Sequence, residues 1–206
     1  MSCLIEENSI VLFQGDSVTD TRRNISISNL GFGYPMMIAS RFTAFYPEKN
    51  VTFINRGVSG NRVKDLKGRW QEDCIDLKPD WVSILIGIND TWRRYDSNDP
   101  TSVEDFENSY RYILARTSEE LHANIIICEP FLLPYPKDRL KWREDLDPKI
   151  QVVRRLAEEF QAIYIPLNEI FASAQYEPNF WAPDGVHPSL SGHALIAQTW
   201  LDAVKA

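Results

Sequence analysis

The stretch that decides the fold reads IVLFQGDSVTD and covers residues 10–20. It begins as an apolar run of strand length and breaks at Gly15, which leaves Ser17 just past the end of a predicted strand. In an open parallel sheet the ligand site lies beyond the carboxyl ends of the strands, so a hydroxyl there faces a bound substrate. Taken alone, Ser17 is better explained as part of an ordinary turn or helix N-cap.

A second stretch, APDGVHP at residues 182–188, changes this interpretation. It places Asp184 and His187 three positions apart in a loop marked by Gly and Pro. A serine hydroxyl becomes a good nucleophile when an imidazole takes its proton, and the imidazole needs an acceptor on its other nitrogen. We therefore predict Ser17 as nucleophile, His187 as base and Asp184 as the acid that orients the base, in one of the chain orders that produce this geometry.

Acyl transfer also needs hydrogen-bond donors aimed at the charge that develops on the carbonyl oxygen. The sequence offers three such donors: the backbone N–H of Ser17, the backbone N–H of Gly60 and the side-chain amide of Asn89. Each of these residues follows a different predicted strand, so all three donors can meet at one crevice.

Apolar strand-like runs alternate with segments of helical spacing along the whole chain. This alternation predicts an α/β fold, a three-layer α/β/α sandwich with a parallel sheet of about five strands and right-handed crossovers, in a single domain of residues 1–206. The further predicted strands are 51–55, 81–87, 124–128 and 162–165, and the predicted helices are 34–46, 62–76, 103–121, 147–160, 168–173 and 189–204.

Two long polar segments, residues 91–102 and 131–148, follow strand ends and are expected to form the rim of the crevice. Aromatic side chains there are candidates for a pocket wall, with Trp92 and Trp181 as the predicted substrate-binding residues. The alternative is that these aromatic rings only pack the loops against the rest of the protein.

The composition excludes several classes of protein. A formal net charge of −7, with acidic and basic residues interspersed, argues against binding to nucleic acid or to an anionic membrane. The three cysteines are widely spaced and form no C-x-x-C motif, which disfavours a disulfide framework and a zinc site. The first residues resemble no secretion signal, and no segment approaches membrane-spanning length, so we expect a cytoplasmic protein.

No metal and no cofactor are expected. A metal site made of Asp184, His187 and His193 is conceivable, but His187 cannot both bind a metal and serve Ser17.

Four blocks of the sequence, in order, resemble those of the SGNH (GDSL-type) esterases and acylhydrolases. The blocks are GDSV at residues 15–18, NRGVSGN at 55–61, GIND at 87–90 and DGVHP at 184–188. The one departure is Val18, where the family name implies Leu. The resemblance implies a flavodoxin-like SGNH hydrolase fold, with Ser17, His187 and Asp184 in the triad and Gly60 and Asn89 as oxyanion donors.

Within the family, residues 59–61 and 79–93 look most like the intracellular bacterial esterases that deacetylate xylo-oligosaccharides. The expected function is therefore a serine carboxylester hydrolase that removes a small acyl group, such as the O-acetyl group of acetylated xylo-oligosaccharides, through an acyl-enzyme intermediate. A lysophospholipase or thioesterase is the alternative within enzymes, and a non-catalytic binding module on the same fold is the alternative outside them. The expected partner is a small acylated substrate, and a homo-oligomer is left open.

Overall fold

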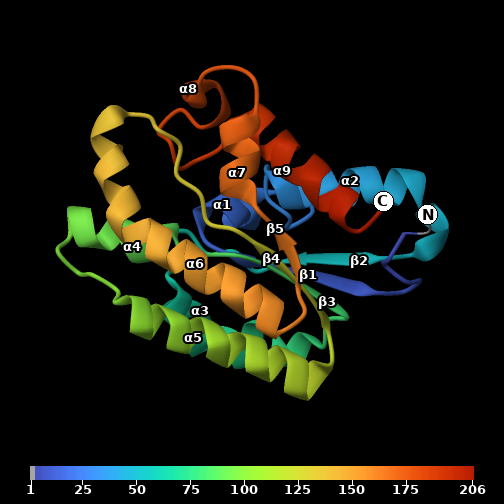
Figure 1. The fold of residues 1–206 in the computed structure, drawn as a ribbon. Coiled ribbons are helices and arrows are strands. Elements are labelled where there is room, and N and C mark those ends of the chain that lie inside the picture. Colours follow the sequence, from blue (N-terminus) through green and yellow to red (C-terminus); the bar gives the residue numbers. More distant parts are fainter. Residues whose placement is uncertain (1–2) are drawn as a thin grey trace.

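The structure, a computed structural model that describes residues 3–206, contains one five-stranded sheet (Figure 1). All neighbouring strands are parallel, and their order is β2-β1-β3-β4-β5. The predicted α/β fold is therefore confirmed. The strands are β1 (Ile10–Gly15), β2 (Thr52–Asn55), β3 (Trp81–Leu85), β4 (Asn124–Cys128) and β5 (Ile163–Ile165).

The strand order changes direction between β1 and β3, because the chain runs from β1 outward to β2 and then returns to β3 on the other side. A doubly wound sheet of this order opens a crevice at this point, beyond the carboxyl ends of the strands. Gly15 is in register with Leu85, so β1 and β3 end at the same level. Ser17 and Asn89, which follow these two strands, therefore start from the same edge of the sheet.

Helices cover both faces of the sheet (Figure 1). Successive side chains of a strand point to opposite faces, so Val11 and Phe13 belong to one core cluster and Leu12 to the other. The first cluster includes α2 (Tyr34–Phe45) and α9 (Leu190–Ala203). The second cluster includes α3 (Val63–Asp73), α5 (Val103–Arg116) and α6 (Arg143–Glu159).

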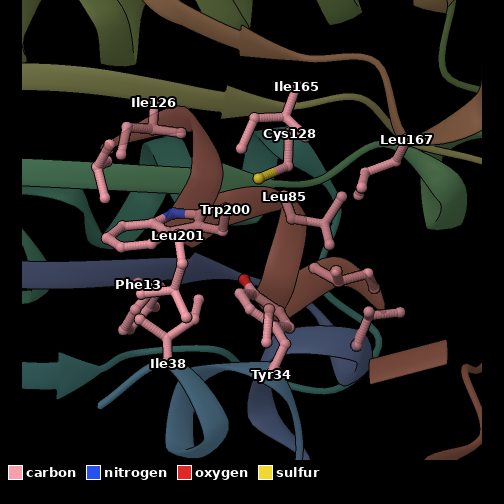
Figure 2. Packing of buried hydrophobic residues seen from close by; sticks show 14 of the residues in the cluster. Phe13, Tyr34, Ile38, Leu85, Ile126, Cys128, Ile165, Leu167, Trp200 and Leu201 are labelled. Atoms are coloured by element: carbon pink, nitrogen blue, oxygen red, sulfur yellow. The ribbon is translucent and has the colours of Figure 1, made fainter. Parts of the chain in front are cut away.

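Aromatic packing joins β1 to the helices of the first cluster, as Figure 2 shows. The ring centroid of Phe13 lies 5.7 Å from that of Tyr34 on α2 and 5.6 Å from that of Trp200 on α9. The indole N–H of Trp200 donates a hydrogen bond to Ser83 Oγ on β3 at 3.0 Å, so the polar edge of this buried ring is satisfied. These contacts fix β1, and with it the turn that carries Ser17, against two helices.

The two segments predicted as rim loops, residues 91–102 and 131–148, contain more helix than predicted. Residues 88–96 form α4 (Ile88–Asp96), although the polar segment was predicted to begin at Thr91. Ile88, Thr91, Trp92 and Tyr95 have helical spacing and lie on the packed side of α4.

The helix predicted over residues 147–160 begins earlier, at Arg143, and contains Pro148. The prediction placed the boundary at the proline, which removes one backbone donor from a helix. The carbonyl deprived of its partner belongs to Glu144, whose exposed position lets water satisfy it. An ion pair between Asp145 and Lys149 spans the proline and supports the first turns.

The remaining helices are short, and no helix among residues 3–206 combines the length and apolar character needed to cross a bilayer. Other segments with helical hydrogen bonding are α1 (Ser17–Asp20), η1 (Arg23–Ile25), η2 (Pro47–Lys49), η3 (Ile75–Leu77), η4 (Thr117–Leu121), η5 (Lys137–Trp142), α7 (Leu167–Ser173) and α8 (Pro178–Trp181).

Candidate active site

Three side chains from opposite ends of the sequence form one hydrogen-bonded line. Ser17 Oγ lies 2.9 Å from His187 Nε2, and His187 Nδ1 lies 2.8 Å from Asp184 Oδ2. With Nδ1 protonated toward the carboxylate, Nε2 is free to accept the proton of the serine hydroxyl. The structure thus brings together the three residues that the sequence predicted as nucleophile, base and orienting acid.

Asp184 and His187 each stabilise the charged form of the other. The hydrogen bond that His187 donates to Asp184 raises the pKa of His187 above its ordinary value, against the effect of burial. Burial alone would raise the pKa of Asp184, but hydrogen bonds from the side chain and backbone of His187 lower it below its usual range. Asp184 is therefore a carboxylate at neutral pH, which stabilises the imidazolium formed when His187 takes a proton.

The loop between Asp184 and His187 owes its shape to a carboxylate and a glycine. Asp184 Oδ1 accepts from the backbone N–H groups of Val186 at 3.0 Å and His187 at 2.7 Å, which closes a tight turn. Gly185 has φ +81°, and a Cβ on it would lie 1.9 Å from the carbonyl oxygen of Tyr135. Only glycine fits this turn, which presents Asp184 and His187 on the same side.

Ser17 is held at the first position of α1 by its neighbour. The side chain of the buried Asp16 caps the helix by accepting from Val18 N at 3.0 Å. Burial raises the pKa of Asp16 to about 7. The short α1 therefore directs Ser17 out of the sheet edge toward His187.

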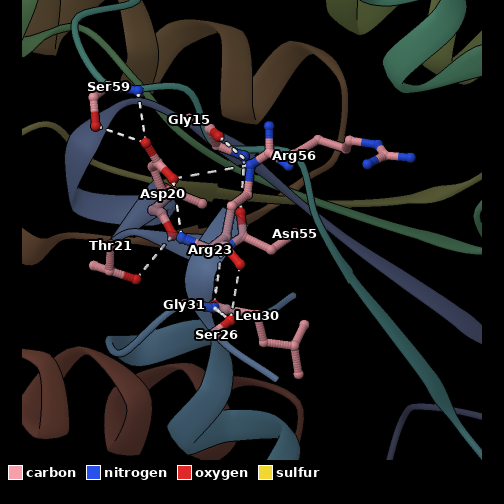
Figure 3. A network of polar contacts seen from close by, with 12 residues as sticks. Gly15, Asp20, Thr21, Arg23, Ser26, Leu30, Gly31, Asn55, Arg56 and Ser59 are labelled. Atoms are coloured by element: carbon pink, nitrogen blue, oxygen red, sulfur yellow. Dashed lines mark hydrogen bonds and ion pairs between the residues drawn. The ribbon is translucent and has the colours of Figure 1, made fainter. Parts of the chain in front are cut away.

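The loop that carries Gly60 is tied to α1 by the polar network in Figure 3. Asp20 Oδ2 accepts from both the backbone N–H and the hydroxyl of Ser59, at 3.1 and 2.7 Å. Asn55 Nδ2 donates to the carbonyl of Thr19 at 2.7 Å. Gly60 has φ +84°, and a Cβ built on it would meet no atom within 4 Å. The network thus fixes Gly60 next to the nucleophile's helix with open space above it.

Asn89 lies in the first turn of α4, directly after the Gly87 bend at φ +134°. Its side-chain amide donates to the carbonyl of Asn61, the neighbour of Gly60, at 3.1 Å. The buried Asp90 accepts from Val63 N at 3.1 Å and so holds α4 against the start of α3. The residues predicted as oxyanion donors therefore lie on segments that are hydrogen-bonded to one another.

The two predicted substrate-binding tryptophans occupy different surroundings. The half-buried Trp92 lies beside the base, with its ring centroid 5.8 Å from that of His187. Trp181 lies on α8, packs against Phe171 and Phe180, and borders a groove of about 440 Å³. Trp92 is thus placed to form a wall of the active site, while a substrate contact for Trp181 remains a prediction.

Sequence reasoning missed Arg139, which donates from Nη1 to the carbonyl oxygen of Asp184 at 2.6 Å. No motif marks this arginine. The helical spacing of the apolar residues in α4 could have indicated that one side of this helix is packed. The structure shows Trp142 and Val186 in that packing.

His193 is a buried structural residue. Its Nδ1 accepts from the backbone N–H of Tyr34 at 3.3 Å, and burial lowers its pKa to about 4. In the part of the chain that the structure describes, no three His, Cys, Asp or Glu side chains are grouped so that they could hold a metal ion.

Comparison with known proteins defines the class. The model of the GDSL-like Lipase/Acylhydrolase family matches residues 13–195. The chain belongs to this family and is a serine carboxylester hydrolase.

Individual relatives show which members of the family the chain is similar to. The chain is 36% identical over 204 residues to an acetylxylan esterase from Geobacillus stearothermophilus, covering 93% of this chain and 91% of the relative. A structure of a catalytic mutant of an acetylxylan esterase from the same organism superimposes with a TM-score of 0.89 at 34% identity, covering 98% of this chain and 96% of the other. A protein from Parabacteroides merdae described as a GDSL-like lipase gives a TM-score of 0.93 at 34% identity, with 99% of both chains covered. The predicted resemblance to acetylxylan esterases is confirmed.

Proposed function

We propose that the protein removes O-acetyl groups from a carbohydrate such as an acetylated xylo-oligosaccharide, with Ser17, His187 and Asp184 as its catalytic triad. The observation that carries this proposal is the hydrogen-bonded line from Ser17 Oγ through the imidazole to Asp184 Oδ2, at 2.9 and 2.8 Å. The Geobacillus relative supports the triad, because its catalytic mutants replace a serine, a histidine and an aspartate, the last two three positions apart as here.

In the first half of the reaction, Ser17 Oγ attacks the acetyl carbonyl carbon while His187 Nε2 takes the hydroxyl proton. The C–O bond to the sugar then breaks, and His187 returns that proton to the departing sugar oxygen. The negative charge on the carbonyl oxygen is stabilised by the N–H groups of Ser17 and Gly60 and by the amide of Asn89.

In the second half, a water molecule attacks the acetyl group on Ser17 and gives a proton to His187. Acetate leaves, and the proton restores the serine hydroxyl. Each turnover therefore consumes one water molecule and needs no metal or redox group.

A short acyl group is supported by the acetylxylan esterase relative, whose name specifies an acetyl ester. The sugar is supported by the name of the acetylxylan esterase relative and by Trp92, an aromatic side chain whose ring centroid lies 5.8 Å from that of the base.

The test is hydrolysis by the purified protein of nitrophenyl esters from acetate to octanoate, together with acetate release from acetylated xylo-oligosaccharides. We expect the highest kcat/KM for the acetyl ester and a steep fall with each added carbon pair. Ser17→Ala serves as the matched control, since it removes the nucleophile and little else.

Preference for the longer esters would contradict the proposal and favour the lysophospholipase or thioesterase alternative. Turnover of nitrophenyl acetate without acetate release from any acetylated sugar would leave an esterase but contradict the carbohydrate substrate. No turnover of any ester would favour the binding module.

We also propose that the protein is located in the cytoplasm. The support is that Cys3, Cys74 and Cys128 are all free thiols, as in proteins of reducing compartments. Fractionation of the source cells tests this directly.

A further inference from the structure

One cation connects the segment after β4 with the loop that carries the base. Arg139, on η5, donates from Nη1 to the carbonyl oxygen of Asp184 at 2.6 Å, and the same nitrogen lies 3.6 Å from Asp184 Oδ2. Its side chain is 18% exposed, so water screens this contact only in part. Arg139 therefore holds both the backbone and the carboxylate of Asp184.

The same guanidinium covers two aromatic rings. It lies 4.6 Å from the ring centroid of Trp92 and 5.0 Å from that of Trp142. Trp142 in turn stacks on Tyr95 of α4, with centroids 5.4 Å apart. Since Trp92 also borders His187, the helix α4, the segment η5 and the catalytic loop all meet at one side chain.

We propose that Arg139 is a positioning residue of the active site: it fixes Asp184 and Trp92 in the arrangement in which His187 can take the proton of Ser17. The proposal rests on the proposed function of the triad. A planar guanidinium suits this role, because it can donate hydrogen bonds at its edge while its face packs on an aromatic ring.

The positive charge of Arg139 affects the pKa of His187, and a purely packing role would not. The charged groups that face His187 are Asp184 on its own loop, Asp16 at the end of β1, and Arg139 on η5. The two carboxylates raise the pKa of His187, whereas Arg139 lowers it. His193, on α9, is neutral near pH 7 because its pKa is lowered to about 4.

The test compares Arg139→Met with Arg139→Lys by measuring kcat and KM for an acetyl ester against pH. For Arg139→Met we expect kcat to fall about tenfold or more, because a small misplacement of the base is costly. The acidic limb of the kcat/KM profile should move to higher pH, since loss of the cation raises the pKa of His187 and the base must be neutral. Arg139→Lys should keep the limb near its original pH while losing part of kcat.

Lys141→Met is the matched control. It removes the same charge from the same helix, and Lys141 is an exposed residue over Tyr95 that contacts neither Asp184 nor Trp92. Its kcat and pH profile should match those of the unaltered protein. Thermal unfolding shows whether each variant is folded, and if Arg139→Met does not fold, Arg139→Gln replaces it.

A folded Arg139→Met with unchanged kcat and an unmoved acidic limb would overturn the proposal. So would an equal change in Lys141→Met. Failure of the triad itself is distinguishable, because Ser17→Ala would then retain activity whatever Arg139 does.

Discussion

At the scale of single residues, the most informative position is Asn89. Its amide donates to the Asn61 carbonyl at 3.1 Å, which holds the side chain ready before a substrate arrives. A donor aimed at a developing negative charge stabilises the transition state more than the bound substrate, so its loss falls on kcat. For Asn89→Ala we expect kcat to fall by about 10²–10³ with KM little changed, as measured by steady-state kinetics on an acetyl ester.

Asn89→Asp separates this role from a purely structural one. It keeps the shape of the side chain but places a carboxylate where the oxyanion develops, so kcat should fall at least as far as in Asn89→Ala. A folded Asn89→Asp with the original kcat would show that Asn89 only shapes the first turn of α4.

At the scale of elements, α4 depends on a buried ion pair in the helix beside it. Lys149 is fully buried on α6 and pairs with Asp145, which also accepts from Thr91 at 2.8 Å and from Arg94 at 3.1 Å. This cluster ties α6 to the helix that carries Asn89.

Removing one partner of a buried pair is costly because it leaves the other charge uncompensated. For Lys149→Met we expect a loss of about 3 kcal/mol in the free energy of unfolding, the lower end of the usual range because Arg94 still pairs with Asp145. The double variant Asp145→Asn with Lys149→Met should recover a large part of that loss in urea unfolding. Equal stability of the single and double variants would contradict this account of α4.

At the scale of the whole molecule, the chain order of the elements could be predicted because each strand is a short apolar run that ends in a marked turn. The positions of Ser17, Asn89 and His187 followed from that order, since parallel strands present their carboxyl ends at one edge. The predicted start of α6 was wrong because a proline such as Pro148 usually marks a helix boundary. In the structure the ion pair between Asp145 and Lys149 supports a helix that continues across the proline.

The contacts of Arg139 could not be predicted from one sequence. Its partner Asp184 lies 45 positions away, and the two meet because η5 packs on Trp92 of α4, which lies beside the catalytic loop. The local sequence pattern thus predicts the site residues at the ends of the strands. The positions of site residues in long loops, such as Arg139, depend on tertiary packing and cannot be predicted in this way.

The central claim is that Ser17 and His187 work as one nucleophilic unit, and a double-mutant cycle on kcat for an acetyl ester tests it most directly. Ser17→Ala and His187→Ala should each remove nearly all activity, and the double variant should be no worse than either, because each single change already disables the unit. Asp184→Ala should retain more activity than these. Losses that add in the double variant would mean that the serine and the histidine act independently, and would contradict the account.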